Sequence, residues 1–307
     1  MTETGYVRNY ELHLPGRIDD SPVGRLLTGS IDMHLHFDPE PHMTRRQNAL
    51  ETALTAREAG MRGFVLKNRC YPTAALASLV STLVPDIAVF GSVTLDYEVG
   101  GLNFHAVEAA GELGAKVVWM PAFCARNSKN IVAKSFGVDH RGEGISMLDS
   151  NGKLVPEVDD IVKATRDYDM VLATGHISPR EILALVDRCK QLGLTKIVVT
   201  HALVTIVMES ILSADERRML AREGVIIEHS AQEIASTGQR HNPDELADAI
   251  RDEGPEHCIM STDFGATPHP ITGEGMRLFI SAMLKSGLSE SDIACMVKLN
   301  PARLLGL

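Results

Sequence analysis

Short apolar runs alternate with longer amphipathic segments eight times along the 307 residues, and this alternation constrains the fold more than any other feature. Parallel strands need long crossover connections, usually helices, so the pattern predicts a parallel sheet. The expected strands span residues 30–36, 62–67, 87–94, 115–120, 169–175, 195–201, 224–230 and 257–262. The expected helices lie near residues 44–59, 73–84, 102–113, 157–167, 178–191, 206–222, 242–253 and 274–286.

Eight such units in a chain of this length favour a closed (β/α)8 TIM barrel of the α/β class. A doubly wound open sheet is the alternative, but no Gly-x-Gly-x-x-Gly follows the first expected strand. A further helical stretch near 289–304 is expected to pack outside the barrel.

No linker divides the chain, so residues 1–307 are expected to form a single domain. Residues 1–28 form a short N-terminal extension, which we expect to cover the barrel bottom or to aid assembly of a homo-oligomer. The longest non-periodic stretch, 123–156, follows the fourth expected strand. On a barrel that position predicts an active-site loop, although a surface insertion is an equally good interpretation.

Composition narrows the classes of partner. Thirty basic against 40 acidic residues give a formal charge of -10, which argues against nucleic acid or an anionic membrane as partner. No 18-residue apolar run is present, and five cysteines without CxxC spacing suit reduced thiols. We therefore expect a cytoplasmic protein that acts on a small molecule.

A possible metal site begins with Asp32-Met33-His34-Leu35-His36. Side chains alternate along a strand, so Asp32, His34 and His36 should share one face, and the two imidazoles form a chelating pair. Three later apolar runs end in His176, His201 and Asp263. A barrel would gather all of these residues at its C-terminal mouth, which predicts a catalytic metal site there.

At this point the chain resembles the amidohydrolase superfamily, metal-dependent hydrolases built on a distorted (β/α)8 barrel. The segment Asn300-Pro301-Ala302-Arg303-Leu304-Leu305-Gly306 is also similar to the one that closes many members. The resemblance implies that one or two metals are held by His34, His36, His176, His201 and Asp263. Imidazole and carboxylate ligands suit Zn²⁺, and Mn²⁺, Fe²⁺ or Ni²⁺ remain open. Asp32 is expected to orient a ligand histidine.

The chain departs from the family pattern at the ligand that bridges two metals. Many relatives carry a carboxylated lysine or a glutamate at the end of strand four, where this chain has Val118-Trp119-Met120-Pro121. Strand two, however, ends in Lys67, whose alternation aims it into the barrel. Carboxylated Lys67 is our candidate bridge, with Cys70 a weaker one. The alternatives are a lysine that binds an anionic substrate or one paired with an acid.

Other residues after expected strand ends are candidates for substrate binding. Arg69 and Arg126 could each hold a carboxylate or phosphate through two hydrogen bonds, which suggests an anionic substrate. His229 ends the expected seventh strand and is a third candidate, although a histidine hydrogen-bonded within the core is an equal alternative.

The resulting expectation is an enzyme in which metal-bound hydroxide attacks the carbonyl of an amide, lactam, lactone or ester. Asp263 would carry the proton from the attacking water to the leaving group. A metal-dependent decarboxylase, hydratase or phosphoesterase on the same barrel is the alternative, and a barrel that binds metal or metabolite without turnover is the second.

Overall fold

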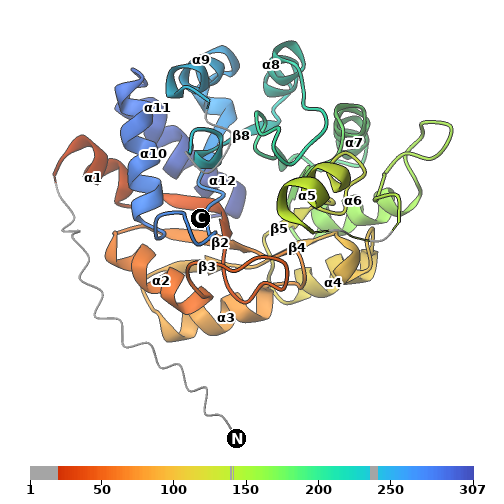
Figure 1. Ribbon diagram of the computed structural model, residues 1–307, viewed down its shortest axis with the longest axis horizontal. Coiled ribbons are helices and arrows are strands. Elements are labelled where there is room, and N and C mark those ends of the chain that lie inside the picture. The colour runs from red at the N-terminus through yellow and green to blue at the C-terminus, as the bar shows by residue number, and fades with distance from the viewer. Residues whose placement is uncertain (1–19, 139, 141, 236–240) are drawn as a thin grey trace, which may run out of the picture.

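A computed structural model of the protein describes residues 20–138, 140, 142–235 and 241–307. In this part of the chain the helices lie around the outside of the strands (Figure 1). The strands are β1 (Ile31–His36), β2 (Gly63–Lys67), β3 (Ala88–Phe90), β4 (Ser92–Thr94), β5 (Val117–Trp119), β6 (Val171–Ala173), β7 (Ile197–Val199), β8 (Ile226–Ser230) and β9 (Cys258–Ser261).

Helix α1 (Pro22–Leu27) precedes the first strand, and the other α-helices come after β1 along the chain. They are α2 (Ala49–Glu58), α3 (Ala74–Leu83), α4 (Phe104–Glu112), α5 (Lys129–Phe136), α6 (Glu157–Asp167), α7 (Pro179–Gln191), α8 (Ala214–Arg222), α9 (Pro243–Glu253), α10 (Glu274–Lys285), α11 (Glu290–Ala294) and α12 (Asn300–Leu305). A π-helical turn, Cys295–Leu299, joins the last two.

All strand pairs are parallel, in the orders β1-β2-β3 and β4-β5-β6-β7-β8-β9. The expected strand 87–94 is split at Gly91, where a Cβ would lie 2.3 Å from the Cα of Ala74. At the other edge, the backbone N–H of Asp263 donates to the oxygen of His34 at 2.9 Å, and that of His36 donates to Phe264 at 2.8 Å. The expected (β/α)8 barrel, distorted, is confirmed.

Side-chain alternation separates the barrel core into an inner and an outer cluster, and a third cluster of the described residues includes Phe123 and Val207. Ile31, Val65, Trp119 and other inward residues fill the barrel, whereas Phe64, Leu66 and their equivalents pack against the helices. The α12 side chains of Ala302, Leu304 and Leu305 join the inner cluster. We expected this stretch to lie outside the barrel, but its apolar side chains instead cover the N-terminal end of the strands.

The described part of the N-terminal extension, α1, packs against α10 and α11 rather than across the barrel bottom (Figure 1). Residues 1–19 of the extension lie outside the described part of the chain. Among the residues that the structure describes, no helix has the length and apolar character needed to cross a bilayer.

Two helices start later than expected. Helix α2 begins after a capping box between Asn48 and Glu51, and α8 begins after one between Ser213 and Glu216. Each box satisfies backbone N–H groups at the first turn and so fixes the start of the helix. The residues before each box, 44–47 and 206–212, therefore belong to loops at the C-terminal end of the strands. The expected loop 123–156 contains α5, and its residues 139 and 141 lie outside the described chain.

Candidate active site

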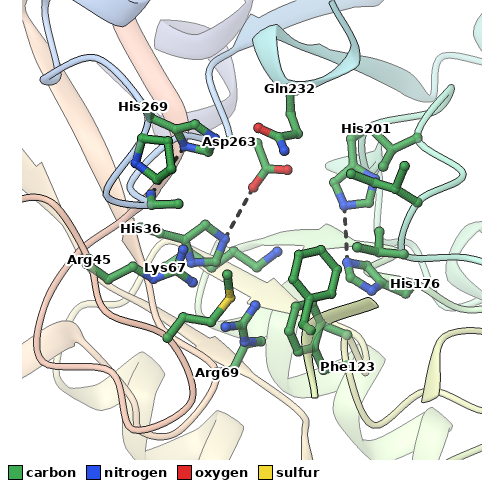
Figure 2. A pocket seen from close by; sticks show the side chains of 18 residues that line it. His36, Arg45, Lys67, Arg69, Phe123, His176, His201, Gln232, Asp263 and His269 are labelled. Carbon is green, nitrogen blue, oxygen red and sulfur yellow. Dashed lines mark hydrogen bonds and ion pairs between the residues drawn. The ribbon is translucent and has the colours of Figure 1, made fainter. Parts of the chain in front are cut away.

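A cavity of about 260 Å³ opens at the C-terminal ends of the strands. His36, Lys67, His176, His201 and Asp263 line it, although each follows or ends a different strand (Figure 2). Figure 2 shows His176 and His201 on one side of the cavity, facing His36 and Asp263. His34 lies beneath them, fully buried.

The first group of possible metal ligands consists of His34, His36 and Asp263. The Nε2 atoms of His34 and His36 lie 3.0 and 3.2 Å from Oδ1 of Asp263. One donor atom from each residue lies within 4.8 Å of the other two, which is close enough for a shared ion. Strand β1 does not alternate regularly here, because its register against β2 shifts between Asp32 and Leu35.

The second group is the pair His176 and His201, whose Nε2 atoms lie 3.1 Å apart. The hydroxyl of Ser128 donates to the carbonyl oxygen of Val207 and therefore accepts from Nδ1 of His176, at 2.9 Å. This arrangement leaves the lone pair of His176 Nε2 directed into the cavity. Ser128, which was not predicted from the sequence, thus orients His176 as a possible ligand.

Glu228 orients His34 in the same way, and it too was missed from the sequence. Nδ1 of His34 lies 3.2 Å from both carboxylate oxygens of Glu228, which also accepts the backbone N–H of His201 at 2.9 Å. Nδ1–H donation leaves Nε2 of His34 facing Oδ1 of Asp263 and, at 2.9 Å, Nζ of Lys67. Outer groups of this kind fix the ring and tautomer of metal-binding histidines.

The expected role of His229 in substrate binding is not supported. Its side chain is fully buried, and its Nε2 lies 2.7 Å from Glu253, with Glu233 3.5 Å from Nδ1. Since Glu228 points into the barrel, its neighbour His229 points outward toward α9. His229 is instead a histidine hydrogen-bonded within the core, which was the alternative interpretation of the sequence.

Asp32 acts on the backbone rather than on a histidine ring. Its carboxylate accepts the backbone N–H of His34 at 3.1 Å and both the N–H and the hydroxyl of Thr262, at 3.1 and 2.5 Å. Burial raises the pKa of Asp32 to about 6, although these hydrogen bonds oppose the rise. Asp32 therefore connects β1 to the end of β9 beside Asp263. The ring of His34 is oriented by Glu228 instead.

The backbone at two possible ligands is strained. His201 and Asp263 have φ values of 25° and 53°, in the left-handed region that non-glycine residues rarely adopt. Gly175, with φ 58°, precedes His176, and a Cβ there would lie 2.2 Å from the oxygen of Met120. Only glycine allows β6 to approach the end of β5 closely enough to place His176.

Lys67 is 1% exposed and lies at the centre of these groups. Its Nζ is 2.9 Å from Nε2 of His34 and 4.3 Å from the ring centroid of Trp119. Burial lowers the pKa of Lys67. Among the described residues no carboxylate lies within ion-pair distance of it, so an acid does not account for its position.

The electrostatics suit a cation bound by neutral imidazoles. Burial lowers the pKa of His36 and of His176 well below the ordinary value and that of His201 to about 4. Burial alone would raise the pKa of Asp263, but His34 and His36 bring it well below its usual range. Burial would lower the pKa of His34 as well, but the carboxylates of Asp263 and Glu228 raise it, so a metal would displace a proton there. Three imidazoles held neutral, this fourth one and the Asp263 carboxylate fit one or two divalent metals.

A pair of arginines borders the same cavity. Glu40 accepts Nε of Arg45 at 2.7 Å and forms an ion pair with Arg69, whose guanidinium lies 3.6 Å from the ring centroid of Phe123. Nε of Arg69 is buried without a hydrogen-bond partner among the described residues. Glu40 offsets one of the two guanidinium charges, so the arginines place positive charge on one side of a cavity that Asp263 also lines. Arg45 was missed because it lay in an expected helix.

Arg126 does not line this cavity. Its side chain is 57% exposed and lies 3.8 Å from Glu143, in a separate polar groove bordered by Asp149 and Arg180. The chain turns back on itself after Phe123, which places Arg126 on the outer side of the loop. Arg126 therefore does not lie beside Arg69 at this cavity, contrary to the expectation that both bind the substrate.

The model of the family described as "Family of unknown function (DUF6282)" matches residues 29–228. This range includes β1 to β7 and all but the last of the possible ligands, Asp263. A comparison with curated proteins found no match.

Solved structures share the fold across most of their length. An amidohydrolase from Pseudomonas aeruginosa is similar with a TM-score of 0.61 and 12% identity, covering 93% of this chain and 98% of that one. A probable dipeptidase from the same organism has a TM-score of 0.61 and 13% identity, over 92% and 96%. A probable 2-pyrone-4,6-dicarboxylic acid hydrolase from Acinetobacter baumannii, with citric acid bound, has a TM-score of 0.60 and 13% identity, over 91% and 100%.

Proposed function

The chain belongs to the DUF6282 family, whose function is unknown, and from its site we propose that it is a metal-dependent hydrolase. The proposed reaction is attack of water on the carbonyl of a small anionic amide, lactam, lactone or ester. The observation that carries this proposal is the convergence of His34, His36 and Asp263 with the pair His176 and His201 on one cavity. The fold shared with structures described as hydrolases supports it.

The residues divide the work of such a reaction. A divalent metal, when bound, would lower the pKa of water toward roughly 7 and polarise a carbonyl. Asp263, ionised and within 3.2 Å of both β1 histidines, would accept the proton of the attacking water and return it to the leaving group. Glu228 and Ser128 would hold the rings of His34 and His176 in the required orientation.

The cavity also indicates the class of substrate. Arg69 and Arg45 would bind a carboxylate, because their shared partner Glu40 neutralises only one of them. Phe123, Val204 and Val207 supply an apolar wall next to them. A small anion with an apolar body fits this lining.

The metal site is tested by removing ligands. We expect His34→Ala and His176→Ala each to lose at least one bound metal per chain, because each removes an imidazole from one of the two groups, while the barrel stays folded. Elemental analysis of purified variants, with circular dichroism for the fold, measures both. His105→Ala is the matched control, since that side chain is 85% exposed on α4.

Full metal content in both folded ligand variants would refute the site. Stoichiometric metal with no turnover across amide, lactone and ester panels would favour a binding protein instead, and release of CO2 or addition of water would favour a decarboxylase or hydratase.

The arginine pair predicts a specific kinetic effect. Arg69→Ala should raise KM for an anionic substrate on the order of 10- to 100-fold, because it removes a charge-assisted hydrogen bond. Arg126→Ala, on the outer side of the loop, should leave KM unchanged. Steady-state kinetics of the two variants gives the comparison. Equal KM values would remove Arg69 from substrate binding.

A further inference from the structure

A second cluster of possible metal ligands lies beside the cavity but shares no residue with it. It consists of His42, Cys70, Glu98, Cys124 and His140. These residues lie on the loops that follow β1, β2, β4 and β5, so the cluster joins four loops at the C-terminal end of the barrel. Cys70, a weaker candidate for the metal bridge, belongs here rather than beside His34.

Glu98 is the centre of the cluster. Nε2 of His42 lies 2.6 Å from its Oε1, and Nδ1 of His140 lies 3.6 Å from the same oxygen. The thiol of Cys124 donates to Oε2 at 3.9 Å. Donor atoms of His42, Cys70 and Glu98 lie within 4.8 Å of one another, as do those of Glu98, Cys124 and His140.

The backbone around the cluster is held mainly by Asp96 and Asn68, and the backbone N–H of Tyr97 also donates to the sulfur of Cys124 at 3.4 Å. Asp96 accepts the backbone N–H groups of Ala122 and Cys124 at 2.8 and 3.1 Å, which ties the loop after β5 to the end of β4. Asn68 accepts the N–H of Cys70 at 2.9 Å and donates to the oxygen of Pro39 at 3.0 Å. The thiols are therefore placed by fixed loops.

Hydrogen bonding alone leaves part of this cluster unexplained. A surface carboxylate with one histidine is an ordinary ion pair, and His42 with Glu98 would be complete as such. The structure adds a second histidine and two thiols to the same carboxylate. Nε2 of His140 is moreover buried without a hydrogen-bond partner among the described residues. Thiolate and imidazole together are the ligands that Zn²⁺ takes in closed sites.

We propose that His42, Cys70, Glu98, Cys124 and His140 form a second, structural site for a thiophilic divalent metal, with Zn²⁺ the best fit. A tetrahedral site takes four ligands, so donors of both groups would have to close around one ion beside Glu98, which the two groups share, and binding would release the thiol protons. Cys70 directly follows Arg69, and Cys124 directly follows Phe123. A metal here would fix the arginine and the aromatic ring that border the active-site cavity.

Sulfur ligation separates this site from the active site, whose possible ligands include no thiol. Cobalt(II) added to the metal-free full-length protein should give an intense sulfur-to-cobalt charge-transfer band. That band should weaken in Cys70→Ser and in Cys124→Ser, disappear when both cysteines are replaced by serine, and persist in His34→Ala. Cys295→Ser is the matched control, because Cys295 is a half-buried free thiol outside the cluster.

Zinc content gives a second readout. Wild-type protein should bind about one Zn²⁺ more per chain than the variant in which Cys70 and Cys124 are both serine, and Zn²⁺ should protect Cys70 and Cys124, but not Cys295, from alkylation. Because Cys124 is buried, Cys70→Ser and His42→Ala provide variants at more exposed positions.

Absence of the charge-transfer band in folded wild-type protein would overturn the proposal, as would alkylation that Zn²⁺ leaves unchanged. A disulfide between Cys70 and Cys124 that forms whether or not Zn²⁺ is present, seen as the loss of two hydrogens in the intact mass, would equally overturn it. Since none of these measurements uses turnover, the result stands apart from the proposed hydrolase activity.

Discussion

Replacing Asp263 with asparagine is expected to reduce kcat by about 10²–10⁴-fold, the contribution of a general acid–base group. Asparagine has nearly the same shape and keeps an oxygen toward His34 and His36, which lie 3.0 and 3.2 Å from Oδ1. It cannot accept a proton from water, however. The loss should therefore fall on kcat far more than on metal content.

Turnover of any accepted substrate and elemental analysis of the same preparation measure the two effects. Asp248→Asn is the matched control, since that carboxylate is 76% exposed on α9, away from the cavity. Turnover of Asp263→Asn at the wild-type level would remove Asp263 from the mechanism. Loss of both metal and turnover would instead make it a ligand without a separate proton-transfer role.

The fold was predictable because hydrophobic periodicity records burial. In β2, Phe64 and Leu66 pack toward the helices while Val65 and Lys67 face the interior, as strict alternation predicts. The candidate ligands were found for the same reason, since a residue that ends a barrel strand lies at the mouth.

The missed parts of the cavity lie where helices were expected to extend too far. Arg45 precedes the capping box of α2, and Val204 and Val207 precede that of α8. Both boxes are visible in the sequence as Asn48-x-x-Glu51 and Ser213-x-x-Glu216. Apolar residues before the second box, such as Val207 and Ile211, continued the helical period, so periodicity outweighed a local signal that was correct. Residues 44–47, before the first box, are polar and gave no such period.

Glu228 was missed for a different reason. Ile226 faces the inner cluster and Ile227 the outer one, so both faces of β8 are apolar. A strand buried on both sides carries no alternation that tells one face from the other. A shift of one residue then exchanged the inward Glu228 for the outward His229.

Removal of the Lys67 amine is the second change for which we expect a large effect. Lys67→Ala should lose at least one metal per chain and, with it, most turnover. The structural reason is that burial lowers the pKa of this 1% exposed amine, which lies 2.9 Å from Nε2 of His34 and has no carboxylate paired to it among the described residues. A neutral amine reacts with CO2 to form a carbamate and release a proton. The carbamate would place one negative charge, shared by two oxygens, between the two histidine groups.

Carbon-13 NMR of protein prepared in labelled bicarbonate should show a carbamate signal that is absent from Lys67→Ala. The signal should remain in the control Lys116→Ala, because Lys116 directly precedes β5 and lies away from the cavity. Acetate should restore part of the lost metal to Lys67→Ala, because a small carboxylate can occupy the space of the missing side chain. If wild-type protein prepared in labelled bicarbonate holds its full metal content but shows no carbamate signal, the bridge is excluded. Lys67 would then remain an ammonium group facing the cavity, and the lost function of Lys67→Ala would appear as a raised KM for anionic substrates at unchanged metal content.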